Sequence, residues 1–426
     1  MNKINIGLIG LGTIGKGVLR ILSRKRKFFK KRFEVDFNIV KICDKNSKLR
    51  KKLNLSPKLF TTKFQDVIND ENIDVVIELI GGINPAKDII MRSLQKGKNV
   101  ITANKALLAQ ELSSILALAN KKKTQIRFEA SVCGGMPIIK SLTEGLIANR
   151  IESVVGIING TSNYILSRMA EQECSFFEAL LEARKRGFAE RNSSLDIKGF
   201  DSAHKLAILA FLAFGKYVFQ KDIYVKGIED ISPLDIKYAK QLGLVIKLLA
   251  IAKKADDNVL EVRVHPTLIS NKHPLATVNG VFNAVYVIGD LVGDLMFSGR
   301  GAGQLPTTSA IISDLVDLAG QKKPLGFLRK GLIKKIKRMD DIRSKYYIRF
   351  MVIDKPGVLS KISGILAKRK ISIASVTQKE RRRAKVVPVV MLIHDARERD
   401  IRVALEEIDK LATTKKKSVV IHREEL

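Results

Sequence analysis

The stretch KINIGLIGLGTIGKGVLR (residues 3–20) decides the fold of the N-terminal part of the chain. Apolar residues recur over 4–9 and predict a buried strand, which ends in the turn GLGTIG (10–15). The segment KGVLRILSR (16–24) that follows has a helical pattern. A strand, a glycine-rich turn and a helix in this order are typical of a site that binds a dinucleotide.

The three glycines of this turn have separate tasks in such a site. Gly10 permits the tight turn, Gly12 lets the backbone approach a pyrophosphate, and Gly15 lets the helix pack closely on the strand. The N-terminus of the helix attracts the phosphates. We therefore expect Gly10, Gly12, Thr13, Ile14 and Gly15 to bind the cofactor, with an ordinary glycine turn as the alternative.

Strands and helices continue to alternate up to about residue 130. This spacing implies parallel βαβ units in an α/β, Rossmann-type doubly wound parallel sheet. The remaining strands are expected over FNIVKICD (37–44), DVVIELIG (74–81), NVIT (99–102) and QIRFEA (125–130), and the helices over 84–97 and 104–122.

Asp44 ends the second predicted strand. An acid at this place binds a ribose 2′-hydroxyl, which favours NAD. It lies 29 residues beyond Gly15 because a basic insertion lengthens the connection. Lys45 and Lys48 beside it could instead hold a 2′-phosphate, so NADP remains open.

The alternation stops near residue 131. Antiparallel strands are expected over 262–299, a helix over 310–319, and the order β-α-β-β-α-β in the last 80 or so residues, which is typical of a ferredoxin-like module. We expect a cofactor-binding domain over 1–130 with 305–322 packed back on it, an α+β substrate and dimerisation domain over 131–304, a linker over 323–344 and a regulatory domain over 345–426.

The composition limits the classes of function. The net charge is +33, but basic runs from RKRKFFKKR (24–32) to RRR (381–383) are scattered among acids, which indicates solvated faces and no specific nucleic-acid site. No apolar run reaches the roughly 18–20 residues of a membrane span, and no secretory signal is present. Cys43, Cys133 and Cys174 have neither metal-ligand nor disulfide spacing, so we expect a cytoplasmic protein.

Charged residues precede a long apolar helix in the stretch FDSAHKLAILAFLAFG (200–215). Asp201 could simply cap this helix and pair with Lys205 four residues later, a contribution of about 0.2–0.5 kcal/mol. With Glu190 and Asp196 just upstream, however, the lysine would sit among carboxylates that hold it protonated or suit a substrate ammonium. The second interpretation predicts a site of proton transfer.

Seven motifs follow one another along the chain: GLGTIG, ELIGG, ITANKALLA, EASVCGGMPII, INGTSNYIL, GFAE with LDIKGFDSAHKLAILA, and GRGAGQLPT. Together they resemble a known family, homoserine dehydrogenase. The resemblance runs from the first strand to about residue 319, and the motifs occur in family order. The end of the chain, with DKPGVLSKISGILAKRKISIASVTQ (354–378), is similar to an ACT module, an amino-acid sensor appended to many bacterial members.

The resemblance implies roles for the charged residues. Lys205 would be the general acid of reduction and the base of the reverse reaction, with Asp201 orienting it and the substrate hydroxyl. Glu190 would bind the substrate amino group, and Asp196 would add to the negative charge on the same side of the site. Lys105 matches the family lysine at the junction of cofactor and substrate, although an exposed lysine at a helix start is the alternative.

Two glycine-containing motifs carry further implications. Gly303 in GRGAG matches a glycine beside the nicotinamide, with an ordinary turn as the alternative. In EASVCGGM, a family site for a monovalent cation, usually sodium, matches Glu129 and the carbonyls of Val132, Gly134 and Met136. Glu129 could instead cap a helix.

Three other residues bear on these expectations. His204 and His265 are interpreted as structural residues, because His204 points about 100° away from Lys205 around the helix. Cys43 stands where many NADP-using members have an arginine, which leaves the choice between NADP and NAD open.

The implied reaction is reduction of L-aspartate 4-semialdehyde to L-homoserine with NAD(P)H, in the biosynthesis of threonine, methionine and isoleucine. Feedback by threonine is expected through the ACT module at the backbone around 356–359, in a homodimer or homotetramer. Another amino-acid dehydrogenase on the same scaffold and a non-catalytic ACT sensor remain as alternatives.

Overall fold

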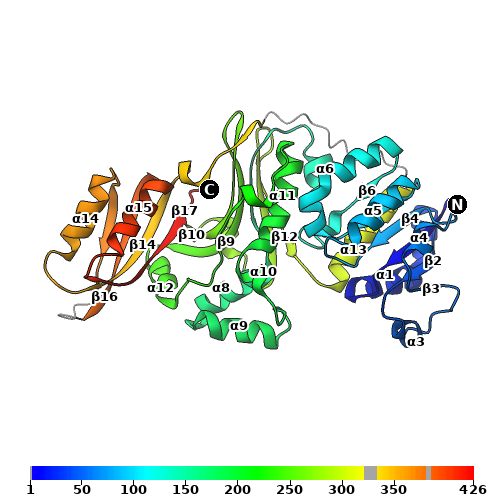
Figure 1. Cartoon of the computed structure of the whole chain (residues 1–426), viewed down its shortest axis with the longest axis horizontal. Coiled ribbons are helices and arrows are strands. Elements are labelled where there is room, and N and C mark those ends of the chain that lie inside the picture. Colours follow the sequence, from blue (N-terminus) through cyan, green and yellow to red (C-terminus); the bar gives the residue numbers. More distant parts are fainter. Residues whose placement is uncertain (1, 321–332, 380–384) are drawn as a thin grey trace. The chain divides into compact units, whose positions relative to one another are not determined.

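The first sheet has six parallel strands in the order β3-β2-β1-β4-β5-β6 (Figure 1). The computed structural model, which describes residues 2–320, 333–379 and 385–426, thereby confirms the predicted Rossmann-type fold. The strand order reverses between β1 and β4, and ligands of such sheets bind where the order reverses. The strands are β1 (Asn2–Ile9), β2 (Val35–Cys43), β3 (Phe60–Thr61), β4 (Val75–Glu78), β5 (Asn99–Thr102) and β6 (Ile126–Arg127).

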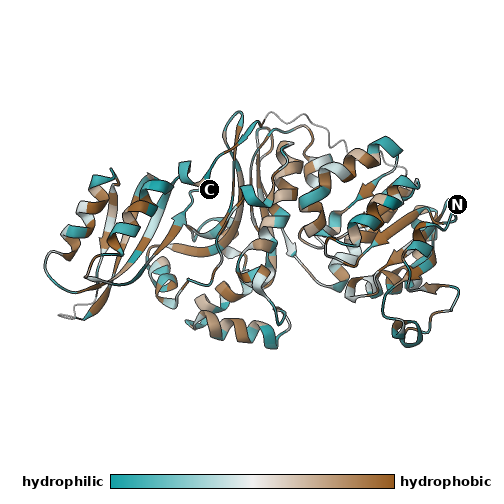
Figure 2. Ribbon diagram, in the orientation of Figure 1, coloured by the Kyte–Doolittle hydropathy of each residue, from teal (hydrophilic) through white to brown (hydrophobic). Residues whose placement is uncertain are grey.

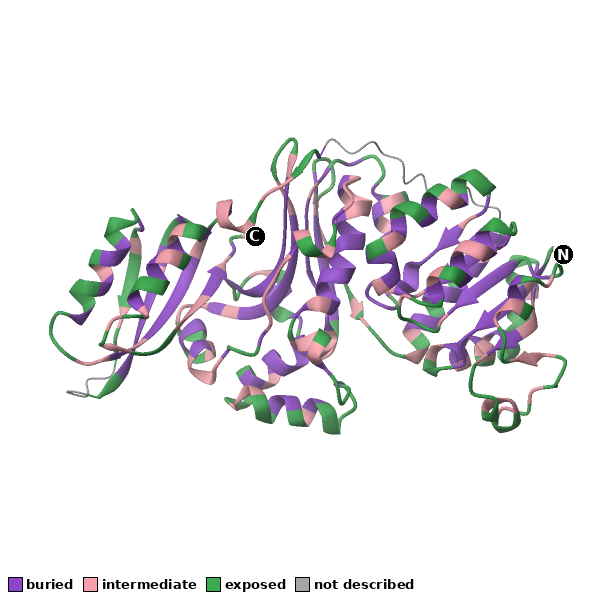
Figure 3. Ribbon diagram, viewed as in Figure 1, coloured by how far each residue is buried: buried purple, intermediate pink, exposed green. Residues whose placement is uncertain are grey.

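Both faces of this sheet are buried, as its nearly continuous apolar strands require (Figure 3). Ile6 and Leu8 pack in one core with α1, whereas Ile9 packs in another with α4 and α5. The basic insertion forms α2, in which Phe29 is buried and Phe28 is exposed. The helices are α1 (Thr13–Arg24), α2 (Arg26–Phe33), α3 (Lys48–Lys52), α4 (Gln65–Ile68), α5 (Ala86–Gln95), α6 (Lys105–Lys122) and α7 (Ile138–Lys140).

Helix α13 (Gln304–Ala319) packs against α1 in the same unit. Gly17 makes the close approach possible, because a Cβ at this position would lie 2.4 Å from the Thr308 hydroxyl. Ile311 and Leu315 of α13 join the core that covers the sheet. A helix that begins about 290 residues later in the sequence therefore supports the helix that follows the glycine-rich turn.

The second unit contains residues 155–203, 221–282 and 333–426. Strands β9 and β10 form a long antiparallel pair at its centre. Strand β7 (Ile151–Ile157) and helix α11 (Phe200–Phe214) each have residues in both units, and β11 (Phe282–Gly289) and β12 (Gly293–Arg300) fall almost wholly in the first. The other elements here are α8 (Gly160–Gln172), α9 (Phe176–Lys185), α10 (Ser194–Ile197), β8 (Tyr224–Val225), α12 (Pro233–Gln241), β9 (Leu244–Asp256) and β10 (Val259–Ser270).

The C-terminal module has the predicted order β-α-β-β-α-β. Its antiparallel strands lie in the order β17-β14-β16-β15, and α14 and α15 each show an apolar and a polar side in Figure 2. The apolar sides pack with Ile348 and Phe350 in one core. The elements are β13 (Lys335–Ile336), β14 (Arg343–Ile353), α14 (Val358–Lys368), β15 (Ile373–Thr377), β16 (Val386–Arg397), α15 (Glu398–Ile408) and β17 (Thr414–Arg423).

This module is firmly joined to the rest of the second unit. Strand β17 pairs in parallel with β10, and Glu424 just beyond it accepts a hydrogen bond of 2.6 Å from buried Arg263. A second buried ion pair joins Arg349 on β14 to Asp235 on α12 at 2.6 Å. Removing one partner of such a pair leaves a buried charge without compensation. Deletion of the module should therefore destabilise the rest of the second unit.

The structure departs from the predicted strands in two places. Strand β6 is shorter than predicted, because the chain turns at 129–131 into a single 3₁₀ turn. Strand β9 was not predicted, since its apolar run has no clear period and could equally be a buried helix. Residues 323–332 of the expected linker and the run 381–383 lie outside the described residues.

Candidate active site

The predicted nucleotide turn, Gly10–Gly15, follows β1 directly. Gly10 has φ of 101°, and its N–H donates to the Cys43 carbonyl at 2.8 Å, which joins the ends of β1 and β2. A Cβ on Gly15 would lie 1.9 Å from the Gly10 carbonyl oxygen, so only glycine fits there. Thr13 and Ile14 are the first two residues of α1. The backbone N–H groups at this helix start are available to bind phosphates.

Asp44 lies beside this turn. Its carboxylate accepts hydrogen bonds from the Leu11 N–H at 2.7 Å and the Asn46 N–H at 2.9 Å, which fixes its position. Asp44, Lys45 and Gly12 line one cavity of about 410 Å³. A carboxylate held in this way can still accept hydrogen bonds from ribose hydroxyls.

Cys43 lines the same cavity. Burial raises the pKa of its thiol to about 11, so the side chain is neutral at physiological pH. It therefore offers a 2′-phosphate no positive charge, unlike an arginine. Lys45 is the cationic residue that lines this cavity among the described residues.

Lys105 is the first residue of α6 and is half-buried. Asn104 caps this helix, since its side-chain oxygen accepts from the Leu107 N–H, and its amide donates to the Gly82 carbonyl at 2.6 Å. Fully buried Glu78 accepts from the Thr102 hydroxyl at 2.7 Å. These bonds join the motifs ELIGG and TANK, a network that the sequence analysis missed.

Gly303 precedes α13 with φ of 119°, a conformation that favours glycine. The next residue, Gln304, donates from its side-chain amide to the Thr13 carbonyl at 2.7 Å. The sequence analysis also missed this contact. It connects the motif GRGAG to the nucleotide turn within one unit.

In the second unit, Asn159 joins two of the predicted acids. Its side-chain amide donates to Asp196 at 2.7 Å and to Asp201 at 2.8 Å, while its side-chain oxygen accepts from the Ser162 N–H and caps α8. We call Asn159, Asp196 and Asp201 the acidic group. Asp196 lies on the short helix α10, and Asp201 is buried. Asn159 was not predicted as a site residue.

Asp201 does not cap α11, because the helix begins one residue earlier at Phe200. It lies instead within the first turn, and Lys205 follows one turn later on the same helical face. Both side chains are buried, with 4% and 8% exposure. Glu190 is exposed on the loop after α9, and the His204 ring contacts Gln220 at 3.3 Å. A buried lysine in a helical turn with a carboxylate is suited to proton transfer.

Glu129 begins the segment predicted to bind a cation. Its carboxylate accepts from the N–H groups of Ile139 and Lys140, each at 2.9 Å, and so caps α7, while its own N–H donates to Asp314 at 3.0 Å. Burial raises the pKa of Glu129 to about 7, and burial with the nearby Glu129 raises that of Asp314 to about 8. Within the described ranges no three acidic, histidine or cysteine side chains are grouped as metal ligands.

Three more residues were predicted to bind the cation through their carbonyl oxygens, and they lie in one turn after Glu129. Cys133 and Gly134 both have positive φ, 55° and 56°, between Val132 and Met136. The Met136 carbonyl accepts from the Ile138 N–H at 2.8 Å. A carbonyl oxygen has two lone pairs, so all three oxygens keep the capacity to bind a hard cation.

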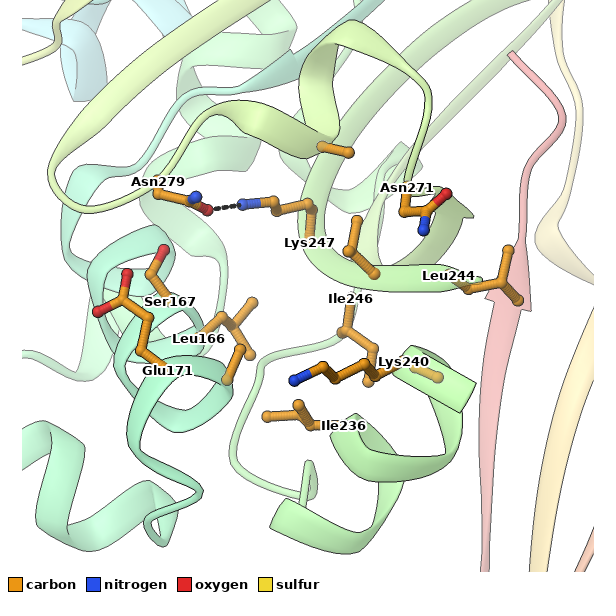
Figure 4. A pocket seen from close by; sticks show the side chains of 14 residues that line it. Leu166, Ser167, Glu171, Ile236, Lys240, Leu244, Ile246, Lys247, Asn271 and Asn279 are labelled. Carbon is orange, nitrogen blue, oxygen red and sulfur yellow. Dashed lines mark hydrogen bonds between the residues drawn. The ribbon is translucent and has the colours of Figure 1, made fainter. Parts of the chain in front are cut away.

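A second buried lysine, Lys247 on β9, was not predicted (Figure 4). Its ammonium donates to the Val278 carbonyl at 2.7 Å and to the Asn279 side chain at 2.9 Å, and Asn163 lies at 3.5 Å. Burial lowers its pKa to about 8. Because its donors already have acceptors, Lys247 holds the loop around Asn279 in place.

Comparison with known proteins identifies the family to which the chain belongs. The chain matches the family models for the homoserine dehydrogenase NAD-binding domain over residues 10–129, homoserine dehydrogenase over 137–316 and the ACT domain over 346–413. It is 44% identical to the homoserine dehydrogenase of Helicobacter pylori, over 96% of both chains, and 41% identical to that of Synechocystis, over 98% of this chain and 99% of the other. The chain belongs to the homoserine dehydrogenase family.

A solved relative agrees with this result. The crystal structure of a homoserine dehydrogenase from Thiobacillus denitrificans superposes with a TM-score of 0.92 at 40% identity, covering 100% of this chain and 99% of the other. The chain is therefore an NAD(P)-dependent oxidoreductase that acts on a CH–OH group and carries a C-terminal ACT domain. The predicted family, fold and class of enzyme are confirmed. In the described ranges no helix is long and apolar enough to span a membrane.

Proposed function

We propose that Lys205 transfers the proton in the reversible reduction of L-aspartate 4-semialdehyde to L-homoserine. The observation that carries this proposal is the acidic group, in which Asn159 joins Asp196 to Asp201, together with the position of Asp201 one helical turn before Lys205 on α11. The nicotinamide cofactor supplies the hydride. Lys205 gives a proton to the carbonyl oxygen as negative charge develops on it, and it takes this proton back during oxidation.

The carboxylates bind and orient the substrate. Asp201 positions Lys205 and the substrate hydroxyl, and Asp196 with Glu190 attracts the substrate ammonium. Glu190 is exposed, so it contributes through charge at the rim of the site and not through a fixed hydrogen bond. Lys105 and Gly303 would hold the reacting end of the cofactor, and the nucleotide turn with Asp44 would bind the other end.

The direct test is the initial rate at which NAD⁺ and NADP⁺ are reduced with homoserine, compared with the rates obtained with related amino alcohols. Homoserine oxidation should favour alkaline pH and reduction should run well near neutrality, because only oxidation needs a neutral lysine. Absence of any homoserine-dependent rate would support a non-catalytic sensor. A higher rate with another amino alcohol would support a different dehydrogenase.

The choice of cofactor is also a proposal. Asp44 supports NAD through the ribose hydroxyls, whereas Lys45 in the same cavity gives NADP a partner for its 2′-phosphate. We propose that the enzyme accepts NADP or NAD, with a preference that depends on these two residues. Initial rates with NADPH and NADH measure it.

A monovalent cation, with sodium as the first candidate, would be held by oxygen atoms of Glu129, Val132, Gly134 and Met136. The all-oxygen donor set suits a hard cation. The Glu129 carboxylate accepts one N–H on each oxygen, which leaves lone pairs for a cation. The melting temperature in sodium chloride should exceed that in choline chloride at equal ionic strength, and equal values would argue against the site.

The remaining expectations concern organisation and control. We propose a cytoplasmic homodimer or homotetramer with a cofactor domain at 1–130, a substrate domain at 131–304 and a regulatory domain at 345–426, inhibited by threonine. Deleting the chain after about residue 340 is a poor test of inhibition, because it would leave Arg263 and Asp235 buried without their partners. Single substitutions are the better test.

A further inference from the structure

Gln304, the first residue of α13, makes two hydrogen bonds to α1. Its side-chain amide donates to the Thr13 carbonyl at 2.7 Å, and its side-chain oxygen accepts from the Arg20 guanidinium at 2.7 Å. A guanidinium has only donors, so the oxygen of the amide must face Arg20 and its NH₂ group must face Thr13. The orientation of the Gln304 amide is therefore determined by its two partners.

The stem of the Gln304 side chain lies over Gly17, between these two partners. A Cβ on Gly17 would lie 2.8 Å from the Gln304 Cγ, so the side chain contacts α1 along two helical turns. All of these residues belong to the first unit. The contact holds the N-terminal ends of α1 and α13 together.

The Thr13 carbonyl belongs to the same peptide group as the Ile14 N–H. A trans peptide is planar, so its C=O and N–H point in opposite directions, and fixing one fixes the other. The Ile14 N–H is among the first four of α1, which have no acceptor within the helix. A hydrogen bond to the carbonyl also polarises the peptide group and strengthens its N–H as a donor.

Other N–H groups of the nucleotide turn are already engaged. The Gly10 N–H donates to the Cys43 carbonyl at 2.8 Å, and the Leu11 N–H donates to the Asp44 carboxylate at 2.7 Å. A phosphate would therefore meet the N–H groups from Gly12 onward, at the start of α1. The Ile14 N–H is one of these groups, and Gln304 holds its peptide from outside the turn.

We propose that Gln304 is a positioning residue for the pyrophosphate of the cofactor, because its bond to the Thr13 carbonyl aims the Ile14 N–H at a phosphate oxygen. The proposal rests on the assignment of the nucleotide turn to the cofactor. It adds a residue of α13 to the binding of the pyrophosphate. Gly303 directly precedes Gln304, so the same short segment would contribute at both ends of the cofactor.

The test is fluorescence titration of the full-length protein with NADPH, followed by competition with ADP-ribose. Gln304→Met keeps the length of the side chain over Gly17 but loses both hydrogen bonds, and it should weaken NADPH binding by about 2-fold to 10-fold. ADP-ribose has the pyrophosphate and lacks the nicotinamide, so its affinity should fall by the same factor. Unchanged affinity for ADP-ribose or for NADPH in Gln304→Met would overturn the proposal.

Two control variants separate the bond to Thr13 from the packing of α13 on α1. Arg20→Met removes only the bond to the Gln304 oxygen, and it should keep NADPH affinity within about twofold of the wild type. Gln95→Met makes the same change at an exposed glutamine that ends α5, and it should leave the affinity unchanged. An equal loss in Arg20→Met and Gln304→Met would assign the effect to packing and overturn the proposal.

A second substitution at the same position covers the case in which Gln304→Met melts early. Gln304→Glu has the same shape and keeps the acceptor for Arg20, but it loses the donor to Thr13. It should weaken NADPH binding at least as much as Gln304→Met, because its charge also opposes the pyrophosphate. Wild-type affinity in Gln304→Glu would overturn the proposal.

Kinetics distinguishes a positioning role from a general loss of structure. Gln304→Met should raise the KM for NADPH and for NADH by the same factor, since both contain the pyrophosphate, while kcat and the KM for the semialdehyde stay unchanged. A fall in kcat without a change in the KM for NADPH would overturn the proposal. Failure of the wild type to bind NADPH would instead contradict the assignment of the nucleotide turn.

Discussion

The nucleotide turn is built from backbone atoms, whereas the acidic group is built from side chains. The turn consists of backbone: Gly10 and Gly15 approach so closely that a Cβ cannot fit, and phosphates would meet N–H groups. The acidic group consists of side chains from α8, α10 and α11, joined by the amide of Asn159. The proposed nucleotide site therefore depends on local chain geometry, whereas the proposed site of proton transfer depends on contacts between residues that are distant in sequence.

The largest expected effect separates these two regions. Lys205→Ala removes the proposed proton donor and should lower kcat by about 10²-fold to 10⁴-fold in both directions. Lys198→Ala, at an exposed lysine seven residues earlier, is the control and should keep normal turnover. Steady-state rates of semialdehyde reduction and homoserine oxidation measure the effect. Near-normal turnover of Lys205→Ala in either direction would remove the lysine from the mechanism.

A smaller effect is expected from Asn159→Asp. The new carboxylate still accepts from the Ser162 N–H, but it loses the donor that faces Asp196 and Asp201 and adds a third negative charge there. The kcat/KM for homoserine should fall by about 10-fold to 100-fold. Asn159→Ser, which keeps the cap without the charge, should lose less. Unchanged kcat/KM in Asn159→Asp would show that the acidic group does not act on the substrate.

A still smaller effect concerns the nucleotide cavity. Asp44→Asn removes the negative charge that opposes a 2′-phosphate and should shift the ratio of NADPH to NADH efficiency toward NADPH by about 10-fold. Lys45→Met should shift it in the opposite direction. Ratios of kcat/KM for the two cofactors measure the shift. Equal ratios in both variants would show that other residues select the cofactor.

The smallest effect is one of stability in the first unit. The pKa of Asp314 is raised to about 8, so its ionisation costs stability that is intact below about pH 4 and is lost as pH rises toward 8. Asp314→Asn keeps an acceptor for the Glu129 N–H and does not ionise. Between pH 5 and 8 its melting temperature should fall by about 3 °C less than that of the wild type. Asp88→Asn, at an exposed acid, should behave like the wild type, and parallel curves for Asp314→Asn would contradict the shift.

The nucleotide region could be predicted almost completely from sequence, because its geometry is local. The turn 10–15 and the strand that ends before Asp44 follow from spacing and from the properties of glycine. The network of Glu78, Thr102 and Asn104 could not be found in this way, since Glu78 ends β4, Thr102 ends β5 and Asn104 caps α6, and only the fold brings them together. Its signal in the sequence was an acid, Glu78, inside the otherwise apolar strand predicted over 74–81.

The acidic group was predicted only in part. Glu190, Asp196, Asp201 and Lys205 were proposed from charges that precede an apolar helix, yet nothing in their spacing indicates Asn159, 37 residues before Asp196. Asn159 caps α8, and a helix cap by itself does not predict the hydrogen bonds of its amide to Asp196 and Asp201.

Binding and turnover measured on the same samples test most directly whether the two regions have separate tasks. NADPH affinity from fluorescence titration and kcat for homoserine oxidation would be determined for the wild type, Lys205→Ala and Asn159→Asp. NADPH affinity should stay within about threefold of the wild type while turnover of Lys205→Ala falls by about 10²-fold or more. A loss of NADPH affinity in proportion to the loss of turnover would contradict the account.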